Sequence, residues 1–181
     1  AGDLIEATSN MGAILKTSAS LKTLAVDLIK VANDLRLLNS GPNTGINEIS
    51  LPSVQPGSSI MPGKVNPVIA EMIDMVGFQV IGNDTTITLA SQAGQLELNV
   101  MMPVAAYNLL NSIEILENSI VIFTEKCVKG IKANEKKCTE YLEKNPIIVT
   151  LLSKYIGYKK ASEIVMKAYK NGKSVKDIIV K

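Results

Sequence analysis

Apolar side chains recur at intervals of three and four residues through the first 38 positions of the sequence. This spacing is typical of one face of an amphipathic helix, and no proline interrupts it, although Gly12 is a weak point. We therefore predict a single helix over residues 3–38, roughly 50 Å long, as in an elongated helical bundle. Its apolar stripe comprises Leu4, Ala7, Met11, Ile14, Leu21, Leu24, Ala25, Leu28, Val31, Ala32 and Leu35.

Two more long helices are predicted farther along the chain. Pro67 suits the first turn of a helix that has Asn66 as its N-cap, and the apolar period continues to about residue 89. A third helix is predicted over residues 97–130, with Pro103 near its start. The second stripe comprises Ile69, Met72, Ile73, Val76, Val80 and Ile81. The third comprises Val100, Val104, Tyr107, Leu110, Ile113, Leu116, Ile120, Phe123 and Cys127.

The last part of the chain has shorter predicted helices and more lysine. These helices are expected near residues 134–143, 146–153, 159–171 and 174–180. We predict an all-α protein in which residues 1–130 form part of a central helical bundle and residues 131–181 form a small helical C-terminal domain. Because the helical pattern is under way at both ends of the sequence, we expect a piece of a longer protein.

The three long helices are apolar on broad faces, and a unit of three helices would leave much of that surface exposed. A homo-oligomer whose copies share a helical core would cover it. The alternative is that the additional apolar residues fill the core of a monomer. We expect no nucleic-acid or membrane partner, because the net charge is only +2 and no apolar run approaches the roughly 20 residues that span a bilayer.

The composition also limits the chemistry available to this chain. The sequence contains no histidine, which excludes a Ser-His-Asp triad, an HExxH zinc site and a histidine base within it. Cys127 and Cys138 are too few for a zinc cluster or a disulfide framework, and Cys127 is expected to be a small buried side chain. We expect neither a metal nor a cofactor. Nothing in the sequence resembles a signal peptide, so the expected compartment is the cytoplasm.

Residues 39–67 break the helical pattern, because glycine and proline alternate there with small polar residues. A connection of this length without a helix is uncommon and is usually functional. Its last part, GSSIMPGKVNP, differs from a phosphate-binding P-loop. The spacing of Gly57 and Gly63 is wrong, Val65 replaces the hydroxyl residue, and no strand precedes the loop.

The residue types in this loop suit the binding of a small carboxylate. Gly57 and Gly63 free the backbone to approach a ligand closely and to adopt positive φ. Ser58 and Ser59 supply hydroxyls, Lys64 supplies a positive charge, and the N-terminus of the following helix favours anions. The pattern indicates a mobile loop, over about residues 55–67, that closes over its ligand. A solvent-exposed linker would have a similar composition.

The segment GSSIMPGKVNP also resembles the signature of the fumarase/aspartase superfamily, whose members are homotetramers that eliminate a group β to a carboxylate and release fumarate. The resemblance continues through NDLRLLNSGPNTGINEISLP, VIGNDTTITLASQAGQLELNVMMPV and CVKGIKAN, and so covers essentially the whole chain. Within the superfamily, AGQLELNVM is closer to the aspartase branch than to the fumarase branch. The resemblance implies a bundle of long helices and the elimination of ammonia from aspartate, with hydration of fumarate as the alternative.

The resemblance also implies roles for individual residues of the loop. Ser58 matches the general base that removes a proton from the carbon beside the substrate carboxylate. Ser59 matches a contact to that carboxylate, and Lys64 and Asn66 match the pair that holds it. Val65, which lies between them, is expected to contribute its backbone. The substrate partner is therefore expected to be a small dicarboxylate such as aspartate or fumarate.

Two further points come from outside the loop. The resemblance matches Glu71 to a glutamate that pairs with the family's active-site histidine, whereas the sequence alone favours a solvated carboxylate. The polar run Asn83, Asp84, Thr85 and Thr86 fits either a site or packing within a bundle. Because the segment with the family's histidine is absent from this sequence, we expect the chain alone to be inactive. The competing hypothesis is a non-catalytic helical module for oligomerisation.

Overall fold

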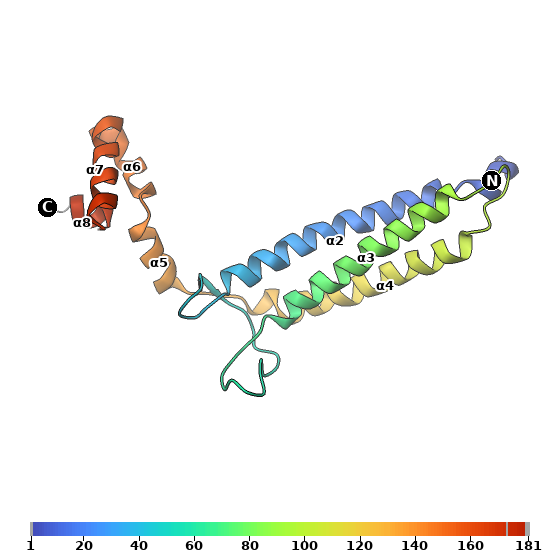
Figure 1. The fold of residues 1–181 in the computed structure, drawn as a ribbon, viewed down its shortest axis with the longest axis horizontal. Helices are drawn as coiled ribbons and strands as arrows, with labels where there is room; N and C mark the ends of the chain where they lie inside the picture. The colour runs from blue at the N-terminus through green and yellow to red at the C-terminus, as the bar shows by residue number, and fades with distance from the viewer. Residues whose placement is uncertain (1, 173, 180–181) are drawn as a thin grey trace. The chain divides into compact units, whose positions relative to one another are not determined.

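The structure is a computed structural model that describes residues 2–172 and 174–179. The chain divides into two compact units, one that ends at Lys132 and one that begins at Ala133. The helices of the first unit are α1 (Leu4–Ser9), α2 (Gly12–Leu38), α3 (Val68–Gln92), α4 (Met102–Lys126) and the short 3₁₀ helix η1 (Val128–Gly130) (Figure 1). Two short strands, β1 (Ile49–Ser50) and β2 (Lys132–Ala133), pair with each other. The all-α prediction is confirmed, since the strands of the described residues have only two residues each.

The long helices α2, α3 and α4 lie side by side and form the bundle of the first unit (Figure 1). Small residues set the distance between α2 and α3. Ala25, Ala32 and Ala70 have no exposed surface, and a Cβ added to Gly77 would lie 2.6 Å from the side chain of Ile29. Because interhelical distance depends on the side chains at the contact, these residues let the two backbones approach closely.

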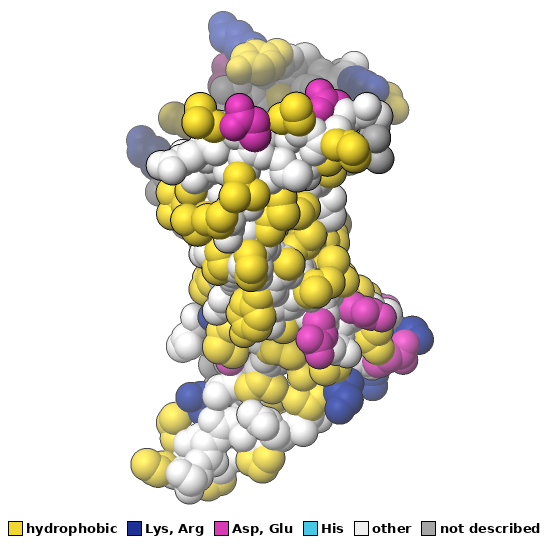
Figure 2. Space-filling model, turned by 90° about the vertical axis from the view of Figure 1, so that its right-hand side faces the viewer, with side chains coloured by type: hydrophobic (Ala, Val, Ile, Leu, Met, Phe, Trp, Pro, Cys, Tyr) yellow, Lys and Arg dark blue, Asp and Glu magenta, His cyan; other side chains and the backbone are white. Residues whose placement is uncertain are grey.

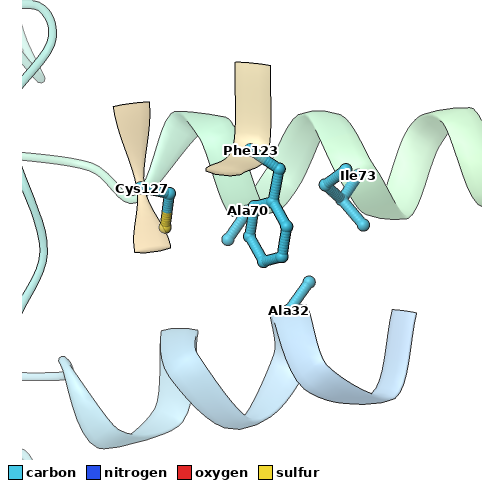
Figure 3. Close-up of a cluster of buried hydrophobic side chains, with 5 residues drawn as sticks. All are labelled: Ala32, Ala70, Ile73, Phe123 and Cys127. Carbon is cyan, nitrogen blue, oxygen red and sulfur yellow. The ribbon is translucent and has the colours of Figure 1, made fainter. Parts of the chain in front are cut away.

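Phe123 of α4 fills the space between α2 and α3 (Figure 3). Its ring packs in a buried cluster with Ala32, Ala70, Ile73 and Cys127. The prediction that Cys127 is a small buried side chain is confirmed, and burial raises the pKa of its thiol. The cluster lies at the end of the bundle where α3 begins, and so supports the connection into that helix.

The prediction of one helix over residues 3–38 is wrong, because the chain leaves helical geometry at Asn10. The backbone of Asn10 is extended, with φ −81° and ψ 119°, and its side-chain Oδ1 accepts the N–H of Gly12 at 2.7 Å. An asparagine side chain that bonds a nearby backbone N–H offers an alternative to the helical bond. The side chain of Asp3 caps α1 by accepting the N–H groups of Ile5 and Glu6.

The ends of α3 and α4 also differ from the predictions. α3 continues to Gln92 instead of residue 89, and α4 runs over Met102–Lys126 instead of residues 97–130. Between them, a tight turn at Gln95 and Leu98 delays the start of α4. Asn99 is buried beside this turn. Its Nδ2 donates to the carbonyl of Ala90, and its Oδ1 accepts the N–H of Met101, so one side chain serves both helices.

Two residues of the polar run at 83–86, Asn83 and Asp84, are buried in the packing of the bundle. Asp84 is buried, and one of its carboxylate oxygens accepts the hydroxyl of Ser18 at 2.7 Å while the other pairs with Lys22 of α2. Asn83 is also buried and donates to the hydroxyl of Ser112 on α4 at 3.0 Å. The hydroxyls of Thr85 and Thr86 donate to carbonyls of their own helix. Buried polar groups with long-range partners fix how the helices register against each other.

The second unit consists of short helices, as predicted, with small shifts at their ends. These are α5 (Glu135–Lys144), α6 (Ile147–Ile156), α7 (Tyr158–Asn171) and α8 (Val175–Ile179). Its core contains Val149, Ala161, Ala168 and Val175. Gly172 ends α7 in the left-handed conformation, with φ 60°, as glycines commonly do after the last turn of a helix. The division into domains of a longer protein stays a prediction.

Large apolar side chains remain exposed along α3 and α4. Hydrophobic side chains cover much of the bundle surface in the view of Figure 2. The exposed apolar residues of these two helices include Met75, Phe78 and Leu89 of α3 and Val104, Tyr107, Leu110 and Ile113 of α4, and Tyr107 is 70% exposed. The apolar stripe predicted for the third helix therefore has two parts. Leu116, Phe123 and Cys127 are buried within the chain, whereas the residues of the stripe from Val100 to Ile113 are exposed. Within the described residues, no helix is both long and apolar enough to span a membrane.

The buried cluster around Phe123 makes the first prediction. Replacing Phe123 by Ala leaves a cavity between α2 and α3, and we expect the free energy of unfolding to fall by about 3–5 kcal/mol. Urea denaturation followed by circular dichroism measures this loss. The matched control is Glu125→Ala, since this exposed side chain on the same helix should cost less than about 1 kcal/mol. Equal losses for the two variants would contradict the packing described above.

Candidate functional site

The loop that leads into α3 is closed at its neck by backbone hydrogen bonding. The N–H of Gly57 donates to the carbonyl of Lys64 at 2.8 Å. The side-chain Nδ2 of Asn66 donates to the carbonyl of Gly57 at 3.0 Å. A Cβ at position 57 would lie 2.5 Å from the Lys64 carbonyl oxygen, so only glycine fits there. The two ends of residues 57–66 are therefore held together directly before the helix.

The hydroxyl of Ser58 lies in a short turn at the start of this loop. Its Oγ accepts the backbone N–H groups of Ile60 and Met61, each at 3.1 Å, and the residue is half-buried. Two backbone donors oriented at one oxygen form a site that stabilises negative charge on it. Two amides of the loop, those of Ile60 and Met61, thus donate to this serine oxygen.

The tip of the loop is open to solvent. Ser59, Ile60, Lys64 and Val65 are exposed, and Gly63 has φ 77°, which lies in the left-handed region that favours glycine. The backbone N–H of Lys64 donates to the carbonyl of Met61 at 3.3 Å. Lys64 is therefore carried on a tight turn, with its side chain exposed to solvent.

An open groove of about 750 Å³ lies between the two halves of the long connection. One side is formed by the turn after α2, with Asn39 and Asn47, and the other by the loop, with Lys64 and Asn66. An adjoining hollow of about 410 Å³ reaches Ser58. The groove thus combines one cation with several amides beside the serine hydroxyl, which is a suitable lining for a small anion.

Glu71 lies in the first turn of α3, five residues after Asn66, and is half-buried. One of its carboxylate oxygens lies 3.9 Å from the guanidinium of Arg36, which belongs to the last turn of α2. The prediction that Asn66 serves as the N-cap of this helix is wrong. The residue before the helix is Pro67, and no side-chain cap is formed, because the Asn66 amide bonds Gly57 instead.

Taken together, the structure brings Gly57, Ser58, Lys64 and Asn66 around one neck and one groove. Ser59 and Val65 lie at the exposed tip, and Glu71 stands at the foot of the loop on α3. Sequence reasoning missed Arg36. The available signal was a basic residue in the last turn of a helix, followed after the loop by two acidic residues at a spacing of three.

The family comparison matches both parts of the chain. Residues 1–82 match the family described as "Lyase", and residues 148–181 match the family described as "Fumarase C C-terminus".

Curated relatives match almost the whole chain. The aspartate ammonia-lyase of Bacillus subtilis is 54% identical over 178 residues, which are 98% of this chain and 38% of the relative. Aspartate ammonia-lyase of Helicobacter pylori is also 54% identical over 178 residues, and that of Escherichia coli is 49% identical over 180 residues, each with 38% of the relative covered. The chain therefore spans 38% of the length of these relatives.

Solved structures share the fold. The fumarate lyase:delta crystallin of Brucella melitensis in native form gives a TM-score of 0.95 at 46% identity, over 100% of this chain and 42% of that chain. The class II fumarase of Schistosoma mansoni gives a TM-score of 0.91 at 41% identity, over 99% of this chain and 38% of that chain. The predicted fold class is confirmed by these similarities.

The crowded surroundings of Gly57 lead to a second prediction, on the effect of replacing this residue by alanine. An alanine there cannot keep the bond from residue 57 to the Lys64 carbonyl, so we expect faster hydrogen exchange across residues 53–66 and a stability loss of about 1–3 kcal/mol. Exchange followed by mass spectrometry measures the first effect. The control is Gly82→Ala on α3, where a Cβ has open space and should stabilise the helix slightly. Unchanged exchange in the Gly57 variant would contradict the closed neck.

Proposed function

The chain belongs to the fumarase/aspartase superfamily, and we propose that the protein that contains it is an aspartate ammonia-lyase, which converts L-aspartate to fumarate and ammonia. The choice of substrate is supported by the curated relatives named above, which are 49–54% identical over nearly the whole chain. Similarity to the class II fumarase is lower, at 41%. For this reason ammonia, and not water, is the proposed leaving group.

The observation that best supports the proposed chemistry is the environment of Ser58. A serine hydroxyl is too weak a base on its own, but its oxyanion is stabilised where preorganised donors point at it. The amides of Ile60 and Met61 already donate to this Oγ at 3.1 Å. In the proposed step, the Ser58 oxyanion removes the proton from the carbon beside the substrate carboxylate. The electron pair of the broken C–H bond moves into that carboxylate, which becomes a dianionic aci-carboxylate.

The same loop would hold the developing charge. Lys64 places its cation at the groove, where it would pair with the substrate carboxylate and stabilise the dianion. Asn66 uses one N–H of its amide on Gly57, and an amide nitrogen carries two, so one remains for the substrate. The hydroxyl of Ser59 and the backbone of Val65 are proposed as further carboxylate contacts. Collapse of the dianion then forms the double bond of fumarate and expels ammonia.

The rest of the active site is proposed to come from sequence outside this chain and from other copies of it. The chain has no histidine and spans 38% of its relatives. The apolar stripes of α3 and α4, which are exposed in the single chain, are the surface on which copies would meet in a tetramer. Glu71 would then support a group from a neighbouring copy.

Turnover assays test this proposal directly. The full-length protein and the 181-residue chain are each incubated with L-aspartate and with L-malate, and fumarate is followed by its ultraviolet absorbance. We expect the full-length protein to form fumarate from aspartate, and the isolated chain to form none from either substrate. Fumarate from malate alone would replace the proposed activity by that of a fumarase. Turnover by the isolated chain would show that the site needs no further sequence.

Ser58→Ala in the full-length protein tests the base. We expect kcat to fall by about 10²–10⁴-fold, since that is the usual contribution of a positioned general base, with the melting temperature little changed. Steady-state kinetics and thermal unfolding provide the two measurements. Ser20→Ala is the control, because this exposed hydroxyl bonds only the Lys16 carbonyl of its own helix among the interactions described. A Ser58 variant that keeps the wild-type rate would remove Ser58 from the mechanism.

A further inference from the structure

Arg36 connects the end of α2 to two carboxylates at the start of α3. Its Nη1 donates to Oδ2 of Asp74 at 2.6 Å, and its Nη2 lies 3.9 Å from Oε1 of Glu71. Glu71 and Asp74 are three residues apart and therefore share one face of the helix. A single planar guanidinium thus faces both acidic groups, in the turns that directly follow the loop.

The two carboxylates differ in their surroundings. Asp74 is 5% exposed, and its other oxygen accepts Nδ2 of Asn33 at 3.3 Å. Arg36 also donates to Oδ1 of Asn33 at 3.1 Å. Asp74 and Asn33 therefore hold the guanidinium firmly, because a buried carboxylate that lost its cation would be left unpaired.

Glu71 is the less constrained partner. Its side chain is 39% exposed, and the 3.9 Å separation is longer than a hydrogen bond, so the pair contributes little to the stability of the fold. The pair does influence the orientation of the Glu71 side chain. A fixed cation on one side of a partly exposed carboxylate favours the side-chain orientation that keeps the two charges close.

We propose that Arg36 is a positioning residue, which is itself fixed by buried Asp74 and which holds the Glu71 carboxylate in place at the foot of the Ser58 loop. The inference rests on the proposed function, in which Glu71 supports the active site. Arg36 acts through Glu71 and does not bind substrate, because its guanidinium is taken up by Asp74, Asn33 and Glu71. Its loss should accordingly lower kcat more than it raises KM.

A double-mutant cycle in the full-length protein separates positioning from general stabilisation. Arg36→Gln is expected to lower kcat by about 10- to 100-fold, the range that a misplaced active-site group costs, with KM changed less than about threefold. In an enzyme that already carries Glu71→Gln, the same substitution should produce no further loss. Arg36→Lys should restore part of the activity, since lysine returns the charge but not the planar fork that faces two carboxylates.

The matched control is Lys22→Gln. Lys22 is another cation of α2 that pairs with a buried carboxylate of α3, Asp84, but the described structure gives it no contact with Glu71 or the loop. This variant should lower the melting temperature and leave kcat unchanged. Arg36→Gln that behaves in the same way would overturn the proposal, and so would equal effects of Arg36→Gln with and without Glu71. Turnover of aspartate by the wild-type protein is measured first and tests the proposed function separately. If the wild-type protein did not turn over aspartate, both the proposed function and the proposed role of Arg36 would be wrong.

Discussion

The close approach of α2 to α3 is the constraint on which the candidate site depends. Ala32 and Ala70 are fully buried where the helices meet, and Gly77 leaves room for the side chain of Ile29, which a Cβ would displace. Larger side chains at these positions would separate the helices, because interhelical distance follows side-chain size. Across this close contact Arg36, near the end of α2, reaches Asp74 and Glu71 in the first turns of α3. The contact between α2 and α3 therefore fixes the position at which the loop joins α3.

The loop combines a fixed foot with an open tip. Its neck is closed by the bonds of Gly57 with Lys64 and Asn66, and it continues directly into α3. Beside the neck, two amides are already oriented at the hydroxyl of Ser58, so charge that develops there needs little reorganisation. Residues 59–65 are exposed. A loop that admits a ligand and then encloses it needs this combination, since its chemistry must stay positioned while its tip moves.

The apolar period of the sequence was sufficient to predict the long helices, because burial of one face dominates their stability. The errors arose at the ends of helices, where local side-chain bonding and turns decide the boundary. The side chain of Asn10 accepts the N–H of Gly12, and α1 ends there. In α3 the hydroxyl of Thr88 bonds the carbonyl of Asp84 within the helix, and the Thr-rich segment stays helical beyond its predicted end. The period also could not distinguish apolar residues buried in the chain from those, such as Tyr107, that remain exposed.

The residue types of the loop indicated an anion site, but they could not indicate what holds the site in place. Arg36 and Asp74 are 38 residues apart in the sequence, so no local pattern pairs them. Within α2, the spacing of three residues relates Arg36 to Asn33, but it does not indicate that both also bind Asp74 of α3. Asp74 is buried in the bundle, so the guanidinium is held by residues of α2 and α3 and not by the loop. The positive charge beside Glu71 is therefore fixed by the packing of α2 against α3.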